Sequence, residues 1–164
     1  MERGPAKQLL ERTYGYWLNG KALDKRPARR LAVVACMDAR LHVPEVLGLR
    51  TGDANIIRNA GGVVTEDVLR SLIVTVRILG VRRIVVINHT RCGMLRFPEA
   101  AFRRALRRAT GRNPGGIAFH GFPHLLSHLC EQVRRIRACP FIPRGVSVTG
   151  LVFEVHSGAL REIA

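Results

Sequence analysis

Residues 31–40, LAVVACMDAR, place a cysteine, an aspartate and an arginine directly after an uninterrupted apolar run. About 50 residues later, residues 84–93, IVVINHTRCG, place a histidine and a second cysteine after a similar run. Short β-branched runs of this kind are typical of strands buried on both faces of a sheet. Both stretches therefore predict strands, and each predicted strand ends in side chains that bind soft metal ions.

Helical and extended patterns alternate along the rest of the chain. We predict helices over residues 6–19, 65–79, 99–109 and 122–137, and strands over residues 31–36, 55–58, 84–88 and 149–155. Residues after 155 are expected to form a short polar tail. Alternating strands and helices indicate an α/β fold, with a parallel doubly wound sheet and helices on both faces. We divide the chain into an N-terminal helix and linker, residues 1–27, and a single α/β domain, residues 28–164.

The reactive residues occur where a parallel sheet binds ligands. In such sheets ligands bind beyond the carboxyl ends of the strands, and the first and third predicted strands carry their reactive residues there. Cys36, His89 and Cys92 suit Zn²⁺, which prefers thiolate and imidazole ligands in a tetrahedral arrangement. A structural zinc is normally closed by a fourth Cys or His, and none lies nearby in the sequence. The pattern therefore predicts an open, catalytic zinc site.

The chain is strongly basic, with 27 Lys and Arg against 12 Asp and Glu and a net charge of +15. Nearly all the basic residues are Arg, and on the predicted helices they recur at the spacing of solvated helix faces, so we expect no specific nucleic-acid partner. No stretch approaches the roughly 20 apolar residues of a membrane span, and the N-terminus lacks a secretory signal. We expect a cytoplasmic protein with no membrane partner, in which Cys130 and Cys139 are buried thiols.

Three motifs occur together in the order and context of a known family. They are Cys36-x-Asp38-x-Arg40, RNAGG at residues 58–62, and His89-x-x-Cys92-Gly93. Over about residues 28–164 the chain resembles the β-class carbonic anhydrases, in particular the short bacterial members. The resemblance implies a parallel four-stranded core, one Zn²⁺ per chain held by two Cys and one His, and a homo-oligomer, either a dimer or a tetramer. It also implies the reversible hydration of CO₂ to bicarbonate and a proton by attack of zinc-bound hydroxide.

Asp38 and Arg40 are the predicted catalytic pair. In an extended chain both project on the same side as Cys36. Arg40 can clamp Asp38 with paired hydrogen bonds and keep it ionised. The carboxylate then accepts a hydrogen bond from the zinc hydroxide and aims its lone pair at CO₂. Two thiolates cancel the charge of Zn²⁺, so we expect the water to be acidified weakly and the activity to be highest at alkaline pH.

Several further residues are expected around the substrate. By resemblance Gly93 contributes to bicarbonate binding through its backbone. Gly61 and Gly62 are expected to allow close chain approach beside the metal, and Val63 and Val64 to form the apolar wall around CO₂; plain turn and core packing is the alternative. Arg91 adds positive charge near the metal. On the first helix, Tyr14, Trp17 and Leu18 are expected to grip a partner subunit.

Two other functions stay open on the sequence alone. Carbonyl sulfide and carbon disulfide are linear molecules similar in shape to CO₂, and the same hydroxide can attack them. The residues that line the substrate site decide between these substrates and CO₂, and they cannot be identified from one sequence. A non-enzymatic basic zinc protein is the alternative of another class. The Asp38–Arg40 pair argues against an inert scaffold, because a purely structural zinc has no use for it.

Overall fold

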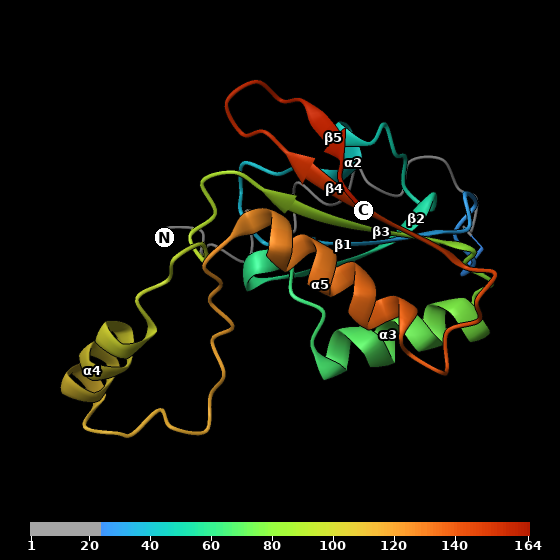
Figure 1. Cartoon of the computed structure of the whole chain (residues 1–164). Coiled ribbons are helices and arrows are strands. Elements are labelled where there is room, and N and C mark those ends of the chain that lie inside the picture. The colour runs from blue at the N-terminus through green and yellow to red at the C-terminus, as the bar shows by residue number, and fades with distance from the viewer. Residues whose placement is uncertain (1–23) are drawn as a thin grey trace, which may run out of the picture.

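Five strands form one sheet at the centre of the chain (Figure 1). In this computed structural model residues 24–164 are described, so the helix predicted over residues 6–19 and its three partner-gripping residues lie outside the described part. The strands are β1 (Leu31–Cys36), β2 (Ala54–Asn59), β3 (Arg83–His89), β4 (Ser147–Phe153) and β5 (Leu160–Glu162). The helices are α2 (Val43–Val46), the 3₁₀ turn η2 (Ala60–Gly62), α3 (Glu66–Arg77), α4 (Glu99–Thr110) and α5 (Leu125–Arg137).

The strand order is β2-β1-β3-β4-β5, and the first four strands are parallel, which confirms the predicted parallel core. The fifth strand, β5, pairs antiparallel with β4, so the polar tail expected after residue 155 was wrong. A turn returns the chain, with the Gly158 N–H donating to the Glu154 carbonyl at 2.8 Å. A strand of three residues is too short to show a hydrophobic period, and it forms because it extends the edge of β4.

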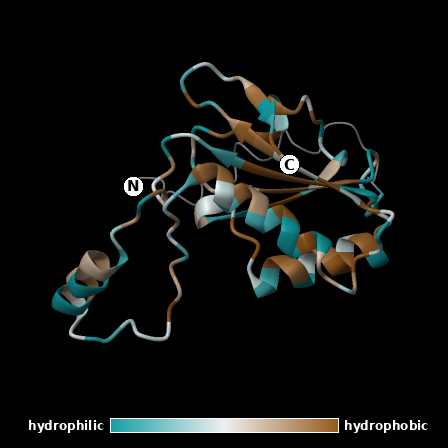
Figure 2. Cartoon of the chain, viewed as in Figure 1, coloured by the Kyte–Doolittle hydropathy of each residue, from teal (hydrophilic) through white to brown (hydrophobic). Residues whose placement is uncertain are grey.

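Alternate residues of β1 enter two different hydrophobic clusters, which explains its uninterrupted apolar run. Ala32 and Val34 pack with residues of α3 and α5. Figure 1 shows these two helices on one face of the sheet, and Figure 2 shows hydrophobic stretches along both. Val33 and Ala35 pack on the opposite face with residues of the loop after β1, including Val43 of the short helix α2. Among residues 24–164, the long helices α3 and α5 thus cover one face, and α2 with its loop lies on the other.

The start of α3 follows the local sequence pattern, whereas the start of α5 is set by a contact with a distant part of the chain. The Thr65 hydroxyl accepts a hydrogen bond from the Val68 N–H at 3.4 Å and caps α3, as predicted. The helix predicted to begin at residue 122 begins instead at Leu125. Phe122 cannot join it because its backbone bridges to Leu95, and its N–H donates to the Met94 carbonyl at 3.0 Å. No helix in the described part of the chain is long and apolar enough to cross a membrane.

Residues 96–121, here called the arm, leave the sheet after β3 and return before α5 (Figure 1). The arm contains α4 and contributes no buried residue to the core. It is held together internally: the Arg103 guanidinium donates to Glu99 at 2.7 Å and to the Pro114 carbonyl at 2.8 Å, and lies 4.9 Å from the centre of the Phe119 ring. The arm is therefore an ordered projection whose surface faces away from its own domain.

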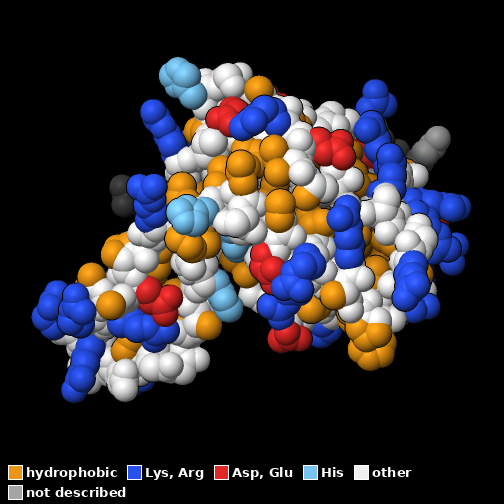
Figure 3. Space-filling model, in the orientation of Figure 1, with side chains coloured by type: hydrophobic (Ala, Val, Ile, Leu, Met, Phe, Trp, Pro, Cys, Tyr) orange, Lys and Arg blue, Asp and Glu red, His pale blue; other side chains and the backbone are white. Residues whose placement is uncertain are grey.

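The basic side chains lie in several separate groups on the face shown in Figure 3. Three arginines on the described helices pair with acids one helical turn away: Arg70 with Asp67 at 2.9 Å, Arg103 with Glu99 at 2.7 Å and Arg134 with Glu131 at 2.6 Å. Pairs at this spacing on exposed helix surfaces are typical of solvated faces.

Candidate metal centre

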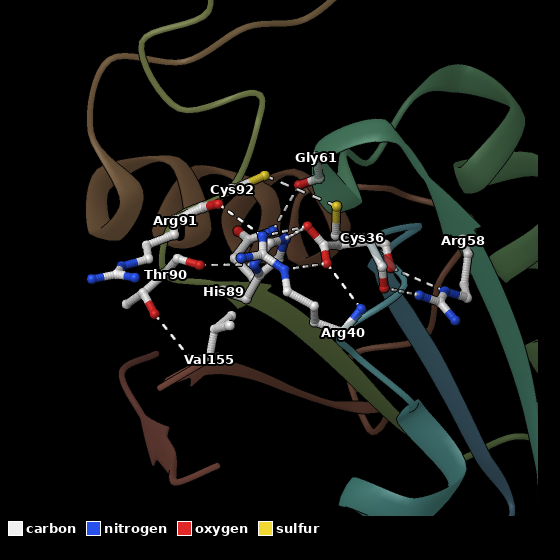
Figure 4. A network of polar contacts seen from close by, with 11 residues as sticks. Cys36, Arg40, Arg58, Gly61, His89, Thr90, Arg91, Cys92 and Val155 are labelled. Carbon is white, nitrogen blue, oxygen red and sulfur yellow. Dashed lines mark hydrogen bonds and ion pairs between the residues drawn. The ribbon is translucent and has the colours of Figure 1, made fainter. Parts of the chain in front are cut away.

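Neighbouring parallel strands bring the three predicted ligands together. Because β1 and β3 are paired in register, with Ala35 beside Ile87, Cys36 and His89 leave the same edge of the sheet. The turn after β3 returns Cys92 to this edge, where its sulfur lies 3.9 Å from that of Cys36. All three side chains are buried, and their ligand atoms lie within 4.8 Å of one another. They could hold a single metal ion, and Figure 4 shows them converging.

The state of His89 fits a metal ligand. Its Nδ1 lies 2.9 Å from the Thr90 carbonyl oxygen, and since a carbonyl can only accept a hydrogen bond, Nδ1 must carry the proton. In the neutral ring the lone pair is therefore on Nε2. Nε2 is fully buried and has no hydrogen-bond partner among the described residues. A buried polar atom is normally satisfied, so an unpaired lone pair beside two thiols indicates a place for a soft cation.

The thiols are also prepared for metal binding. The hydrogen bond between the two sulfurs is the main cause that lowers the pKa of the Cys36 thiol, against the opposing effect of burial. This hydrogen bond favours the thiolate form of Cys36, with the proton on Cys92. Metal binding releases the remaining proton, because the thiolate is the ligand form.

Asp38 and Arg40 form the pair that the sequence predicts. The Asp38 Oδ1 accepts hydrogen bonds from the Arg40 backbone N–H at 3.0 Å and from its Nε at 2.9 Å, and Oδ2 accepts one from Nη2 at 2.7 Å. The hydrogen bonds from Arg40 hold the pKa of Asp38 well below 3.8, against partial burial. Oδ2 lies 3.8 Å from the His89 Nε2, so an ionised carboxylate stands directly beside the metal position.

Arg91 acts through its backbone. Its carbonyl oxygen accepts a second hydrogen bond from the Arg40 Nη2, at 3.0 Å. To present this carbonyl, Arg91 adopts a left-handed conformation with φ of 54°. In Figure 4 its guanidinium points away from the two cysteines, so its charge lies farther from the ligands than the sequence suggested.

Three side-chain amides hold the glycine loop beside the metal ligands. The Asn88 Nδ2 donates to the Gly61 carbonyl at 2.8 Å, and the Gln132 Oε1 accepts from the Val64 N–H at 2.7 Å. Asn59 makes two bonds to the backbone of Val63, at 2.7 and 2.8 Å. The sequence analysis predicted that the glycine loop lies beside the metal, but it assigned no role to these three amides. Asn59 belongs to the RNAGG motif, whereas Gln132 lies on α5, and no pattern around it indicates a contact with the loop.

Gly62 is required by its surroundings. It has φ of +61°, and a Cβ would lie 2.9 Å from the Asn88 Nδ2 and 3.0 Å from the Cys36 nitrogen. We expect Gly62→Ala to lower the free energy of unfolding by about 2–4 kcal/mol, because the added methyl group forces atoms apart in a packed site and alanine must also adopt a left-handed conformation. Gly80→Ala is the matched control, since Gly80 has φ of +75° but nothing within 4 Å of its Cβ position.

Urea unfolding of both glycine variants measures this difference. Gly80→Ala should lose only about 1 kcal/mol, the cost of a left-handed conformation for alanine. Equal losses in the two variants would mean that the site imposes no steric demand on Gly62.

The other predicted residues are placed as follows. Val63 and Val64 are buried after the glycine loop, with Val63 6% exposed. Gly93 is exposed in the turn after the last ligand, and nothing lies within 4 Å of its Cβ position. Cys139 is half-buried, and Cys130 is exposed on α5, so its assignment as a buried thiol was wrong because it lies on the outer side of that helix.

Known proteins match both the sequence and this geometry. The family model for carbonic anhydrase matches residues 31–111. The β-carbonic anhydrase 1 of Mycobacterium tuberculosis is 44% identical over 141 residues, which cover 86% of this chain and 86% of that protein. The chain belongs to the β-carbonic anhydrase family.

Two further matches refine this membership. The carbonic anhydrase structure from Streptococcus mutans superposes with a TM-score of 0.92 at 37% identity and covers 100% of both chains. A carbon disulfide hydrolase of Acidithiobacillus thiooxidans is 37% identical over 178 residues, covering 94% of this chain and 89% of that protein. The chain is thus similar both to carbonic anhydrases and to a carbon disulfide hydrolase. Its sequence identity to the carbonic anhydrase of M. tuberculosis, 44%, is higher than its identity to this hydrolase, 37%. The protein is an enzyme of the carbonic anhydrase class.

Proposed function

We propose that this protein catalyses the reversible hydration of CO₂ to bicarbonate and a proton at one zinc ion held by Cys36, His89 and Cys92. The observation that carries the proposal is the ionised Asp38 carboxylate, fixed by Arg40 3.8 Å from the free nitrogen of His89. A purely structural metal site has no use for a carboxylate held beside its ligands. The proposal therefore assigns Asp38 to the reaction.

The role of zinc, when bound, is to supply a nucleophile by lowering the pKa of a water molecule. Asp38 orients that nucleophile. Its Oδ1 already accepts two hydrogen bonds and Oδ2 one, so Oδ2 can accept another from the hydroxide nucleophile. Because an ionised carboxylate can only accept, the single O–H of the hydroxide must donate to it, and a lone pair of the hydroxide oxygen then faces the carbon of CO₂.

The apolar side of the site favours CO₂ over water. The position of a Cβ on Gly61 would be 3.2 Å from the Val63 side chain and 3.3 Å from that of Met94, so apolar atoms lie close beside the loop. We assign Gly61, Gly62 and Val63 to the wall that holds CO₂. The exposed Gly93 leaves room for bicarbonate to approach a backbone N–H.

Stopped-flow CO₂ hydration between pH 6.5 and 9, on protein of measured zinc content, tests the proposal. We expect about one zinc per chain and activity that rises toward alkaline pH, because two thiolates neutralise the metal charge. Full zinc with no CO₂ turnover at any pH would contradict it.

Hydrolysis of carbonyl sulfide or carbon disulfide is the second candidate. It is favoured by the similarity to the carbon disulfide hydrolase described above, which extends over nearly the whole chain. The same preparation can be assayed for sulfide release from each compound. A kcat/KM for either compound above that for CO₂ would make this candidate the main function.

We also propose that the enzyme is a homodimer in which the arm contacts the second copy. A helix of 12 residues is marginal in water unless it packs against another element, yet no residue of α4 is buried. The arm exposes apolar side chains, with Phe102 38% and Ile117 55% exposed. A second copy is the proposed occupant because an identical arm offers the same exposed apolar side chains, which two copies can bury against each other. The four arginines of α4 repel one another across such a contact, so we place the contact on the apolar side of each arm.

We expect a molecular mass near twice 18.2 kDa by light scattering, and a shift to monomer in Ile117→Asp. A charge in a buried apolar contact is costly, whereas the same charge on a free surface is tolerated. Ile78→Asp is the control, since Ile78 is 61% exposed at the end of α3, outside the arm. A monomeric parent protein, or a dimer in both variants, would contradict the role of the arm.

A further inference from the structure

We propose that Arg58 is a positioning residue that holds the backbone of Cys36 and Asp38 in the geometry the metal and the substrate require. Its Nε donates to the Cys36 carbonyl at 3.0 Å, and its Nη2 donates to the Asp38 carbonyl at 2.7 Å. One guanidinium thus binds the backbone on both sides of Met37. Figure 4 shows Arg58 beside Cys36, on the side away from His89.

The position of Arg58 follows from the sheet. Arg58 lies on β2 and pairs with Ala35, the residue before the first ligand. The last backbone contact between the two strands is the Met37 N–H donating to the Asn59 carbonyl at 2.8 Å. Beyond Met37 the chain leaves the sheet, and ladder hydrogen bonds no longer fix it. The Arg58 side chain extends past this last backbone hydrogen bond and binds the backbone of the next residue, Asp38.

The charged guanidinium of Arg58 interacts with the Cys36 and Asp38 carbonyls and with no carboxylate of the described chain. Among residues 24–164 no carboxylate forms an ion pair with it, in contrast to Arg40, which binds the Asp38 carboxylate directly. A planar guanidinium fits two acceptors at fixed spacing, and hydrogen bonds from a charged donor are stronger than neutral ones. Asp38 is therefore held through its carboxylate by Arg40, and through its carbonyl by Arg58 together with the Leu41 N–H, which donates at 3.0 Å.

The consequence differs from simple stabilisation. Without Arg58, the Cys36 and Asp38 carbonyls each lose a charged hydrogen-bond donor, so the backbone that carries the Cys36 sulfur and the Asp38 carboxylate is held less firmly. Partners that orient metal ligands from the outside typically contribute tenfold to a hundredfold in metal affinity or activity. The inference rests on the proposed function for its catalytic part and on the ligand set alone for its metal-binding part.

The test compares Arg58→Met and Arg58→Lys with the control Arg77→Met. Arg77 also donates to a backbone carbonyl, that of Phe141, at 2.8 Å, but it lies on α3 away from the metal ligands. The zinc dissociation constant is measured by competition with a chromogenic chelator, and kcat and KM for CO₂ hydration on zinc-saturated protein. We expect Arg58→Met to weaken zinc binding about tenfold and to lower kcat by about tenfold to a hundredfold, with KM changed much less.

Arg58→Lys should give intermediate values, because an ammonium can reach a carbonyl but cannot bind two in one plane. Arg77→Met should keep the parent values. If Arg58→Met lowers only the melting temperature, or keeps both zinc affinity and kcat within twofold, the proposal is overturned. If the parent protein fails to hydrate CO₂, the zinc affinities still decide the metal-binding part, so failure of the proposed function remains distinguishable.

Discussion

His89→Ala is expected to leave the protein without stoichiometric zinc and to lower kcat/KM for CO₂ hydration by at least about a thousandfold. His89 supplies a buried nitrogen, Nε2, that has no hydrogen-bond partner in the described chain, while its Nδ1 is committed to the Thr90 carbonyl. Loss of the metal removes both the nucleophile and several kcal/mol of charge stabilisation, and each 1.4 kcal/mol is a factor of ten. Zinc per chain and stopped-flow rates measure the two effects together.

A fold defect must be separated from a metal defect in this experiment. His89 is 0% exposed, so alanine leaves a cavity in addition to removing a ligand. His89→Gln fills most of the space and is expected to lose zinc equally. His156→Ala is the matched control, because His156 is exposed in the turn between β4 and β5. Stoichiometric zinc in a folded His89→Gln protein would show that the other residues suffice and that the ligand assignment is incorrect.

The grouping of the three candidate metal ligands could be predicted from sequence because each of them lies in a local pattern. Cys36 and Asp38 follow one buried strand, and His89 and Cys92 follow another. A parallel sheet necessarily places the ends of neighbouring strands at one edge. The Asp38–Arg40 contact needs only two residues of separation, and it is observed with a distance of 2.7 Å. The positions of these residues along the chain, together with the rule for parallel sheets, were sufficient to predict that they lie together.

The supporting contacts could not be predicted in the same way. Gln132 reaches the glycine loop from 68 residues farther along the chain, and Arg91 contributes its carbonyl and not its charge. Phe122 pairs with Leu95 and so delays the start of α5, although its local pattern favours a helix. These features depend on which elements meet in space. A pattern of apolar and polar residues indicates that a side chain is buried, but does not identify its partner.

Asp38→Asn is expected to keep full zinc and to lower kcat by about a hundredfold to a thousandfold, the effect of removing one preorganised partner of the reacting group. Asparagine has nearly the same shape but no charge. Its amide can donate, so the hydroxide nucleophile is no longer forced to present its hydrogen to this side chain. The measurement is stopped-flow kcat with zinc content determined on the same sample, and a decrease of less than about fivefold would exclude Asp38 from the reaction.

Arg40→Met separates the charge of Asp38 from its orientation. Arg40 lowers the pKa of Asp38 below 3.8, so its removal allows that pKa to rise again toward its ordinary value. Even then the carboxylate is ionised above pH 6, so loss of charge cannot explain an effect at neutral pH. We expect kcat to fall by about tenfold to a hundredfold with the shape of the pH profile between 6.5 and 9 unchanged, because only the fixed direction of the carboxylate is lost. A profile that gains an acidic limb in this range would instead mean that Arg40 acts by keeping Asp38 charged, which would require an environment far less polar than the 18% exposed carboxylate has here.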